Sequence, residues 1–280
     1  MSPTDRPRPD ATQRCRPANV AESSSNIHDL PAPAQTPPPV GALPRSAVLP
    51  QVPGYRVLEE VGRGGMGVVY KAVHEGLKRT VAIKMIPPEV PTDAIEVARF
   101  YAEAEVVAAI QHPNVVQVFE FSQAGGRPYM AMEYLPGGTL SSRLTTPTSV
   151  VDAAALVELL ARAVQAAHEQ GVVHRDLKPG NVLFDAEGQP RITDFGLAKR
   201  VASNLTRTQA VMGTPAYMAP EQASGRTKYA GPAADIYALG VILYECLVGE
   251  PPCGRDGESW QVLHRVLNAP VIEPRARRSN

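Results

Sequence analysis

A run of glycines at residues 62–67 limits the fold of this chain more than any other feature of its sequence. The run spells Gly-x-Gly-x-x-Gly, from Gly62 through Gly64 to Gly67. In a dinucleotide-binding fold this pattern opens a helix. Here it leads into residues 68–73, whose β-branched and aromatic side chains predict a strand. We therefore expect a glycine-rich turn between two strands, whose amides can approach phosphate oxygens because no Cβ intervenes.

The charge balance argues against several classes of partner. The 280 residues hold 28 Lys and Arg against 28 Asp and Glu, so the formal net charge is zero. Nucleic-acid and membrane-surface proteins usually carry excess basic charge, and we expect neither partner. The longest apolar run, residues 236–248, contains Glu245 and is too short to span a bilayer. Three cysteines without a Cys-x-x-Cys pair fit a reducing compartment, so we expect a cytoplasmic location.

Composition separates an N-terminal tail from the rest of the chain. Residues 1–50 hold 11 of the 28 prolines. Such a segment buries too little apolar area to offset the entropy lost on ordering. We expect a disordered proline-rich tail, with a docking site for a proline-reading domain as the alternative.

The first part of the folded region, residues 51–135, predicts a small antiparallel sheet. Its strand-like runs cover residues 68–73, 81–86, 115–121 and 128–134. The short turns between them favour antiparallel neighbours. Residues 93–110 have a helical pattern that ends before His112 and Pro113, so we expect the sheet to carry one helix.

The second part, residues 136–272, predicts mainly helices. Apolar residues recur at helical spacing over 153–170, where Asp152 is a candidate N-cap. A second long helix is expected over 233–248. Residues 273–280 are expected to form a basic tail, and the whole folded region is therefore of the α+β class.

Lys84 is the first charged candidate for a site. It follows Ala82 by two residues in a strand, so both side chains lie on one face. The small residue could pack on a flat base while the lysine reaches phosphate oxygens. An edge-strand lysine that only aids solubility is the alternative. Nineteen residues later Glu103 is the candidate ion-pair partner of Lys84, and Glu105 is its competitor.

The segment His174-Arg175-Asp176-Leu177-Lys178-Pro179-Gly180-Asn181 is more specific. A positioned carboxylate at Asp176 could accept the proton of an incoming hydroxyl. Lys178 could neutralise charge on a transferring phosphate. The oxygens of Asn181 and of Asp194, in Asp194-Phe195-Gly196, suit Mg²⁺.

These motifs together carry a resemblance to a known family. Residues 55–272 resemble a protein kinase of the eukaryotic serine/threonine type, and the form of the glycine loop is most similar to the bacterial members. The supporting residues occur in the family's order: Gly62 to Val69, Lys84, Glu103, His112 to Asn114, His174 to Asn181, Asp194 to Gly196, Ala219 to Glu221, and Asp235.

The resemblance implies a two-lobed fold, with residues 51–135 as the sheet lobe and 136–272 as a mainly helical larger lobe. It implies Asp176, Lys178, Lys84 and Glu103 as catalytic residues, and Asn181 and Asp194 as ligands of Mg²⁺, with Mn²⁺ as an alternative ion. The residues implied in ATP binding are Gly62, Arg63, Gly64, Gly65, Met66, Gly67, Val69, Ala82, Lys84, Met132, Glu133, Leu135 and Leu183.

The implied activity is transfer of the γ-phosphate of ATP to serine or threonine hydroxyls of protein substrates. Lys178, two residues after Asp176, is similar to the serine/threonine pattern. Arg175 next to Asp176 implies regulation by a phosphorylated loop, for which Thr206 and Thr208 are the candidate phosphosites. A homodimer could perform this autophosphorylation in trans.

The end of the sequence departs from the family pattern. A complete larger lobe would continue through further helices, with an arginine that pairs with the glutamate matching Glu221. We therefore expect a C-terminally truncated catalytic domain whose larger lobe is shortened. The alternative function is a truncated kinase-like module that binds ATP but is inactive or regulatory, and a dinucleotide-binding oxidoreductase is a more distant one.

Overall fold

The computed structural model describes residues 49–64, 67–86, 105, 107–195, 215–225 and 231–278. Val48–Asn280 forms one compact unit. The predicted tail at 1–50 lies outside the described residues except for its last two positions. Most of the predicted helix at 93–110 also lies outside them, and in its last turns Glu105, Val107 and Ala108 are helical.

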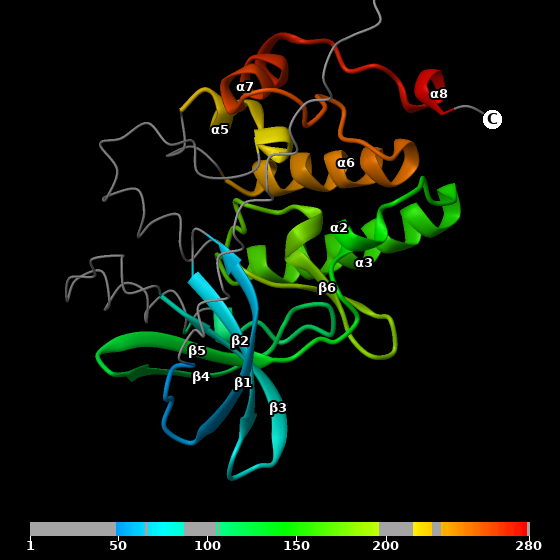
Figure 1. The fold of residues 1–280 in the computed structure, drawn as a ribbon. Helices are drawn as coiled ribbons and strands as arrows, with labels where there is room; N and C mark the ends of the chain where they lie inside the picture. Colours follow the sequence, from blue (N-terminus) through cyan, green and yellow to red (C-terminus); the bar gives the residue numbers. More distant parts are fainter. Residues whose placement is uncertain are drawn as a thin grey trace, which may run out of the picture. The chain divides into compact units, whose positions relative to one another are not determined.

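The first part of the unit is a sheet of five strands within the described residues (Figure 1). All neighbours are antiparallel, in the order β1-β2-β3-β5-β4. The strands are β1 (Tyr55–Gly64), β2 (Gly67–His74), β3 (Arg79–Met85), β4 (Val118–Ala124) and β5 (Arg127–Glu133). The predicted antiparallel sheet is confirmed.

The start of β4 differs from the prediction of a strand from residue 115. Val115 instead forms a parallel bridge with Ile192, and the Val116 amide donates to the Ile192 carbonyl oxygen at 2.9 Å. These two valines are buried against a different part of the chain. Although Val115 and Val116 have a strand-like composition, they therefore connect to the segment at Ile192 and are not part of β4.

Strand β3 separates two apolar cores because successive side chains point to opposite faces. Val81, Ile83 and Met85 pack in one core with residues of the neighbouring strands. Ala82 points to the other face and belongs to the core that continues into the helical part. Lys84 shares that second face, as the spacing of two residues predicted.

The second part of the unit is mainly helical (Figure 1). Its elements are α2 (Leu140–Arg143), α3 (Val150–Glu169), η1 (Pro179–Asn181), β6 (Val182–Phe184), β7 (Pro190–Ile192), η2 (Pro215–Tyr217), α5 (Pro220–Ala223), α6 (Pro232–Val248), α7 (Ser259–Asn268) and α8 (Pro274–Arg277). Helix α8 occupies the segment that was expected to be a basic tail.

Helix α3 begins earlier than the sequence suggested. Its N-cap is Ser149, whose side chain accepts from the Asp152 amide at 3.0 Å, so the prediction of Asp152 as the cap is wrong. Serine and aspartate are both good caps, and composition does not separate them. The helix ends as expected, since Gly171 adopts φ +74° just beyond its last residues.

Helix α6 is apolar around most of its surface and packs beside α3, as the orange and green helices of Figure 1 show. Two acidic residues are nevertheless buried on it, Asp235 in the first turn and Glu245 near the end. The Tyr217 hydroxyl donates to Glu245 Oε2 at 2.5 Å, and Arg255 forms an ion pair with Oε1. Burial raises the pKa of Glu245, and Tyr217 and Arg255 act against that rise.

Candidate active site

The glycine run lies where the antiparallel strands β1 and β2 meet. Gly64, the last residue of β1, lies opposite Gly67, the first of β2. Gly67 has φ +147°, and a Cβ added there would lie 2.7 Å from the Met85 carbonyl oxygen, so a side chain is excluded. Gly65 and Met66 lie outside the described residues. The helix required by a dinucleotide-binding motif is replaced by β2.

Five of the residues implied in ATP binding lie in one apolar cluster. Ala82, Met132 and Leu135 are buried members of this cluster, and Val69 and Leu183 are partly buried and pack against the cluster. They come from β2, β3, the end of β5, the segment after it, and β6. The cluster thus includes these five side chains from both parts of the unit.

The segment after β5 is tied to β6 by backbone bonds. The Gly137 amide donates to the Phe184 carbonyl oxygen at 2.8 Å, and the Phe184 amide donates to Gly138 at 3.0 Å. A Cβ on Gly137 would lie 2.7 Å from two carbonyl oxygens, so only glycine permits this approach. The connection between the sheet and the helical part therefore has a defined path.

Glu133, the last residue of β5, makes contacts through both its backbone and its side chain. Its amide donates to the Gln117 carbonyl oxygen at 2.9 Å. Its carboxylate lies 3.3 Å from the guanidinium of Arg191 on β7, which also contacts Asp185 at 3.3 Å. Glu133, one of the residues implied in ATP binding, is thereby joined to the strand that leads to Asp194.

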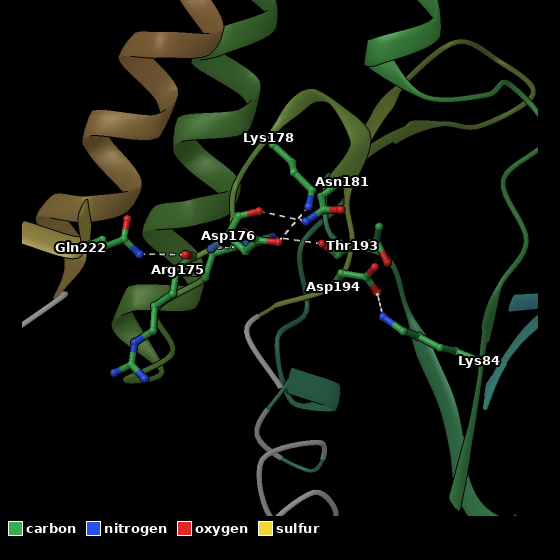
Figure 2. A network of polar contacts seen from close by, with 9 residues as sticks. Lys84, Arg175, Asp176, Lys178, Asn181, Thr193, Asp194 and Gln222 are labelled. Carbon is green, nitrogen blue, oxygen red and sulfur yellow. Dashed lines mark hydrogen bonds and ion pairs between the residues drawn. The ribbon is translucent and has the colours of Figure 1, made fainter. Parts of the chain in front are cut away.

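Lys84 pairs with Asp194 across 110 residues of sequence. The ammonium donates to Asp194 Oδ1 at 2.6 Å, and both side chains are largely buried (Figure 2). The predicted partner Glu103 lies outside the described residues. Oδ2 of Asp194 takes no part in this bond, and carboxylate oxygens are ligands that divalent cations prefer.

Two side chains of its own loop bind Asp176. Lys178 Nζ donates to Asp176 Oδ2 at 3.0 Å, and the Asn181 side-chain amide donates to the Asp176 carbonyl oxygen at 2.9 Å (Figure 2). Because the nitrogen of Asn181 is used in this bond, its oxygen is the atom available to a metal. The donor set of Asn181 and Asp194 oxygens fits a hard divalent cation.

Asp235 binds the backbone of the loop that carries Asp176. One carboxylate oxygen accepts the Arg175 amide, and the other accepts the His174 amide and lies next to His168 Nε2, each at 2.8 Å. Arg175 and Asp194 both adopt φ +62°, a conformation that costs about 1–3 kcal/mol for a residue with a side chain. The surrounding bonds hold both residues in it.

His174 is completely buried and takes one tautomer. Its Nδ1 accepts the Asp176 amide at 3.3 Å, so the proton lies on Nε2, which faces the Thr193 carbonyl oxygen at 3.0 Å. The ring also packs on Phe195, with centroids 4.8 Å apart. Burial lowers the pKa of His174 below its ordinary value, against the opposing effect of Asp235.

Two residues of this network were not predicted as part of the site. They are His168 and Gln222. Gln222 on α5 donates from its side chain to the Arg175 carbonyl oxygen at 2.9 Å (Figure 2). Gln222 directly follows the Ala219 to Glu221 motif, but that motif does not include it, and His168 has no motif beside it. The predicted phosphosites Thr206 and Thr208 lie outside the described residues.

Comparison with known proteins agrees with this arrangement. Residues 55–278 match the family model described as the protein kinase domain. The chain belongs to the protein kinase family. It is 41% identical over 228 residues to the serine/threonine-protein kinase PknA of Mycobacterium tuberculosis, which covers 79% of this chain and 52% of that protein. Its fold is thus the two-lobed kinase fold, with the sheet as one lobe.

Two further relatives are bacterial serine/threonine-protein kinases. PkaA of Streptomyces coelicolor is 40% identical over 238 residues, with 79% of this chain and 43% of that protein covered. PrkC of Bacillus subtilis is 38% identical over 208 residues, with 73% and 32% covered. The kinase chain thus spans about half the length of PknA, and less of the other two.

Family membership implies ATP and a divalent metal in general terms, and the Asn181 and Asp194 oxygens suit them. In the part of the kinase that the structure describes, no helix has the length and apolar character to cross a membrane.

Proposed function

We propose that this kinase transfers the γ-phosphate of Mg-ATP to serine and threonine hydroxyls of proteins. The convergence of Lys84, Asp194, Asp176 and Asn181, which come from three separate segments, carries the proposal. Lys84 pairs with Asp194 at 2.6 Å, and Asn181 bonds to the Asp176 carbonyl oxygen at 2.9 Å. The amide of Thr193, next to Asp194, donates to the Asn181 carbonyl oxygen at 2.9 Å and links the two groups. The names of the relatives support the choice of serine and threonine.

Each lobe has a distinct part in the proposed reaction. Residues 51–135 hold ATP, with Gly62, Gly64 and Gly67 over the phosphates and Lys84 in contact with their oxygens. Residues 136–272 bind the protein substrate. Val69, Ala82, Met132, Leu135 and Leu183 enclose adenine, and the backbone from Glu133 to Leu135 offers it hydrogen bonds. This organisation places the nucleotide against the face of β3 that carries Ala82 and Lys84.

Asp176 orients the substrate hydroxyl and accepts its proton. Lys178 stabilises the negative charge that moves with the phosphoryl group. Asn181 and Asp194 hold Mg²⁺, or Mn²⁺ in its place, which supplies positive charge to the phosphates when bound. Most of the catalysis is then positioning and charge stabilisation, as expected for phosphoryl transfer.

The retention of these four side chains favours an active kinase over a module that only binds ATP. Lys84 and Asp194 are already paired, and Asp176 is placed by Lys178 and by its loop. A module that had lost its chemistry would not need this combination of charges in contact.

We propose that the kinase phosphorylates its own loop at Thr206 or Thr208, by a second copy acting in trans. The phosphate would pair with Arg175. Because the reaction consumes ATP, we place it in the cytoplasm. Phosphopeptide mapping of the purified protein after incubation with Mg-ATP tests the sites, and phosphate found only elsewhere would contradict them.

The test of the proposed function is phosphate transfer from labelled ATP to a generic protein substrate, followed by identification of the modified amino acids. We expect phosphoserine and phosphothreonine. In Lys84→Met the rate of transfer should fall by at least about 100-fold, since the positive charge that contacts the phosphates is removed. Lys78→Met, in the β2–β3 turn, is the control and should keep the wild-type rate. Equal activity in Lys84→Met would contradict the role of that lysine.

A further inference from the structure

The peptide unit between Arg175 and Asp176 is held at both of its polar atoms. Its N–H, on Asp176, points at His174 Nδ1 at 3.3 Å. Its carbonyl oxygen, on Arg175, accepts the side-chain amide of Gln222 at 2.9 Å (Figure 2). Because a peptide unit is planar, these two bonds fix the orientation of the whole plane. That plane sets the direction in which the Asp176 side chain leaves the backbone.

The plane needs such support because Arg175 is in the left-handed region, with φ +62°. This conformation persists only where surrounding groups favour it strongly. The Arg175 amide is bound to Asp235 on α6 at 2.8 Å, which holds the residue on its N-terminal side. On the C-terminal side of Arg175, its carbonyl oxygen is bound by Gln222, which lies in a helix 47 residues away in sequence.

The side chain of Gln222 is itself fixed. Its oxygen accepts the Ala219 amide at 3.0 Å at the start of α5. With the oxygen used in this cap, the nitrogen is directed at Arg175. Glutamine fits because it combines an acceptor for Ala219 and a donor for Arg175 in one rigid amide.

We propose that Gln222 is a positioning residue for the catalytic base: it holds the 175–176 peptide plane and so couples the placement of Asp176 to the docking of α5. The proposal rests on the proposed function, because it assumes that Asp176 acts on the substrate. It adds a dependence of the catalytic loop on the segment that contains Ala219 and Gln222.

Gln222→Glu separates the two bonds of the side chain. A carboxylate still accepts the Ala219 amide, so the start of α5 is preserved, but it cannot donate to the Arg175 carbonyl oxygen. Gln222→Met removes both bonds. Gln261→Glu is the matched control, because Gln261 Oε1 makes the same cap on the Glu258 amide at the start of α7, at 2.9 Å.

Two measurements on the full chain test the proposal. In hydrogen exchange, the peptide that contains residues 174–181 should exchange faster in Gln222→Glu and Gln222→Met than in the wild type and in Gln261→Glu. In phosphate transfer, Gln222→Glu should lose about tenfold in kcat, the value of one hydrogen bond of about 1.4 kcal/mol. Its KM for ATP and its melting temperature should stay near those of Gln261→Glu.

Unchanged exchange in residues 174–181 of Gln222→Glu would overturn the proposal, whether or not the wild type transfers phosphate. Faster exchange with an unchanged kcat would also overturn it, since the bond would then have no catalytic role. A wild type without phosphate transfer would instead remove the proposed function, and with it the positioning of a base. Faster exchange with a lower kcat and a constant KM would support the proposal.

Discussion

Replacement of Asp235 by asparagine should weaken the fold and loosen the loop that carries Asp176. Asp235 is 1% exposed. Its two carboxylate oxygens face the amides of His174 and Arg175 and the Nε2 of His168, each at 2.8 Å. The carboxylate is therefore the acceptor that satisfies both backbone amides in this buried site.

The magnitude follows from the shape of the new side chain. Asparagine has one acceptor oxygen, so its NH₂ group must face one of the two backbone amides. That amide is left buried without an acceptor, at a cost of about 1–3 kcal/mol. The remaining bonds lose the contribution of the charge, about 1 kcal/mol. The total of about 2–4 kcal/mol should lower Tm by roughly 4–16 °C in a domain of this size.

The assay is urea and thermal unfolding of Asp235→Asn beside the wild type. Asp152→Asn is the control, because Asp152 is an exposed residue in the first turn of α3 and its loss should cost less than about 1 kcal/mol. A loss in Asp235→Asn no larger than that in Asp152→Asn would refute the view that this carboxylate holds the loop.

Two further predictions concern buried charge. Burial lowers the pKa of His174, so stability should be complete above the ordinary pKa near 6.5 and fall at lower pH, by up to about 1.4 kcal/mol per pH unit. His174→Gln should remove that part of the slope between pH 7.5 and 5 in urea unfolding, and an unchanged slope would contradict the assignment. Arg255→Met leaves the buried Glu245 carboxylate without its cation, and should cost about 1–3 kcal/mol at pH 7, since Arg255 is half-exposed. The cost should shrink at acid pH, because burial already raises the pKa of Glu245 and the protonated group needs no cation. Arg162→Met, in an exposed pair on α3, should cost less than about 0.5 kcal/mol at both pH values, and equal costs in the two variants would contradict the prediction.

The sheet was predictable because its strands have local signals. The alternation that places Ala82 and Lys84 on one face is a property of the strand itself, and the structure shows both on that face. The boundary of β4 was not predictable in the same way. Val115 and Val116 have strand composition, but their partner is Ile192, and only the folded chain determines that pairing.

In the site, too, some residues could be predicted from the sequence and others could not. Short motifs identified Asp176, Asn181 and Asp194, because each has a fixed spacing in sequence. Gln222 and His168 could not be found, since their roles depend on the left-handed backbone of Arg175 and on the buried Asp235. Both conditions arise from packing between segments that are far apart in the chain.

The most direct test of the account compares Asp176→Asn with the wild type in two assays, ATP binding in the presence of Mg²⁺ and transfer of the γ-phosphate to a protein. We predict that ATP binding stays within about threefold, because Lys84, Asn181 and Asp194 remain, and that transfer falls by at least about 100-fold with the loss of the base. Transfer at the wild-type rate in Asp176→Asn would contradict the assignment of Asp176 as the base of a phosphate-transfer reaction.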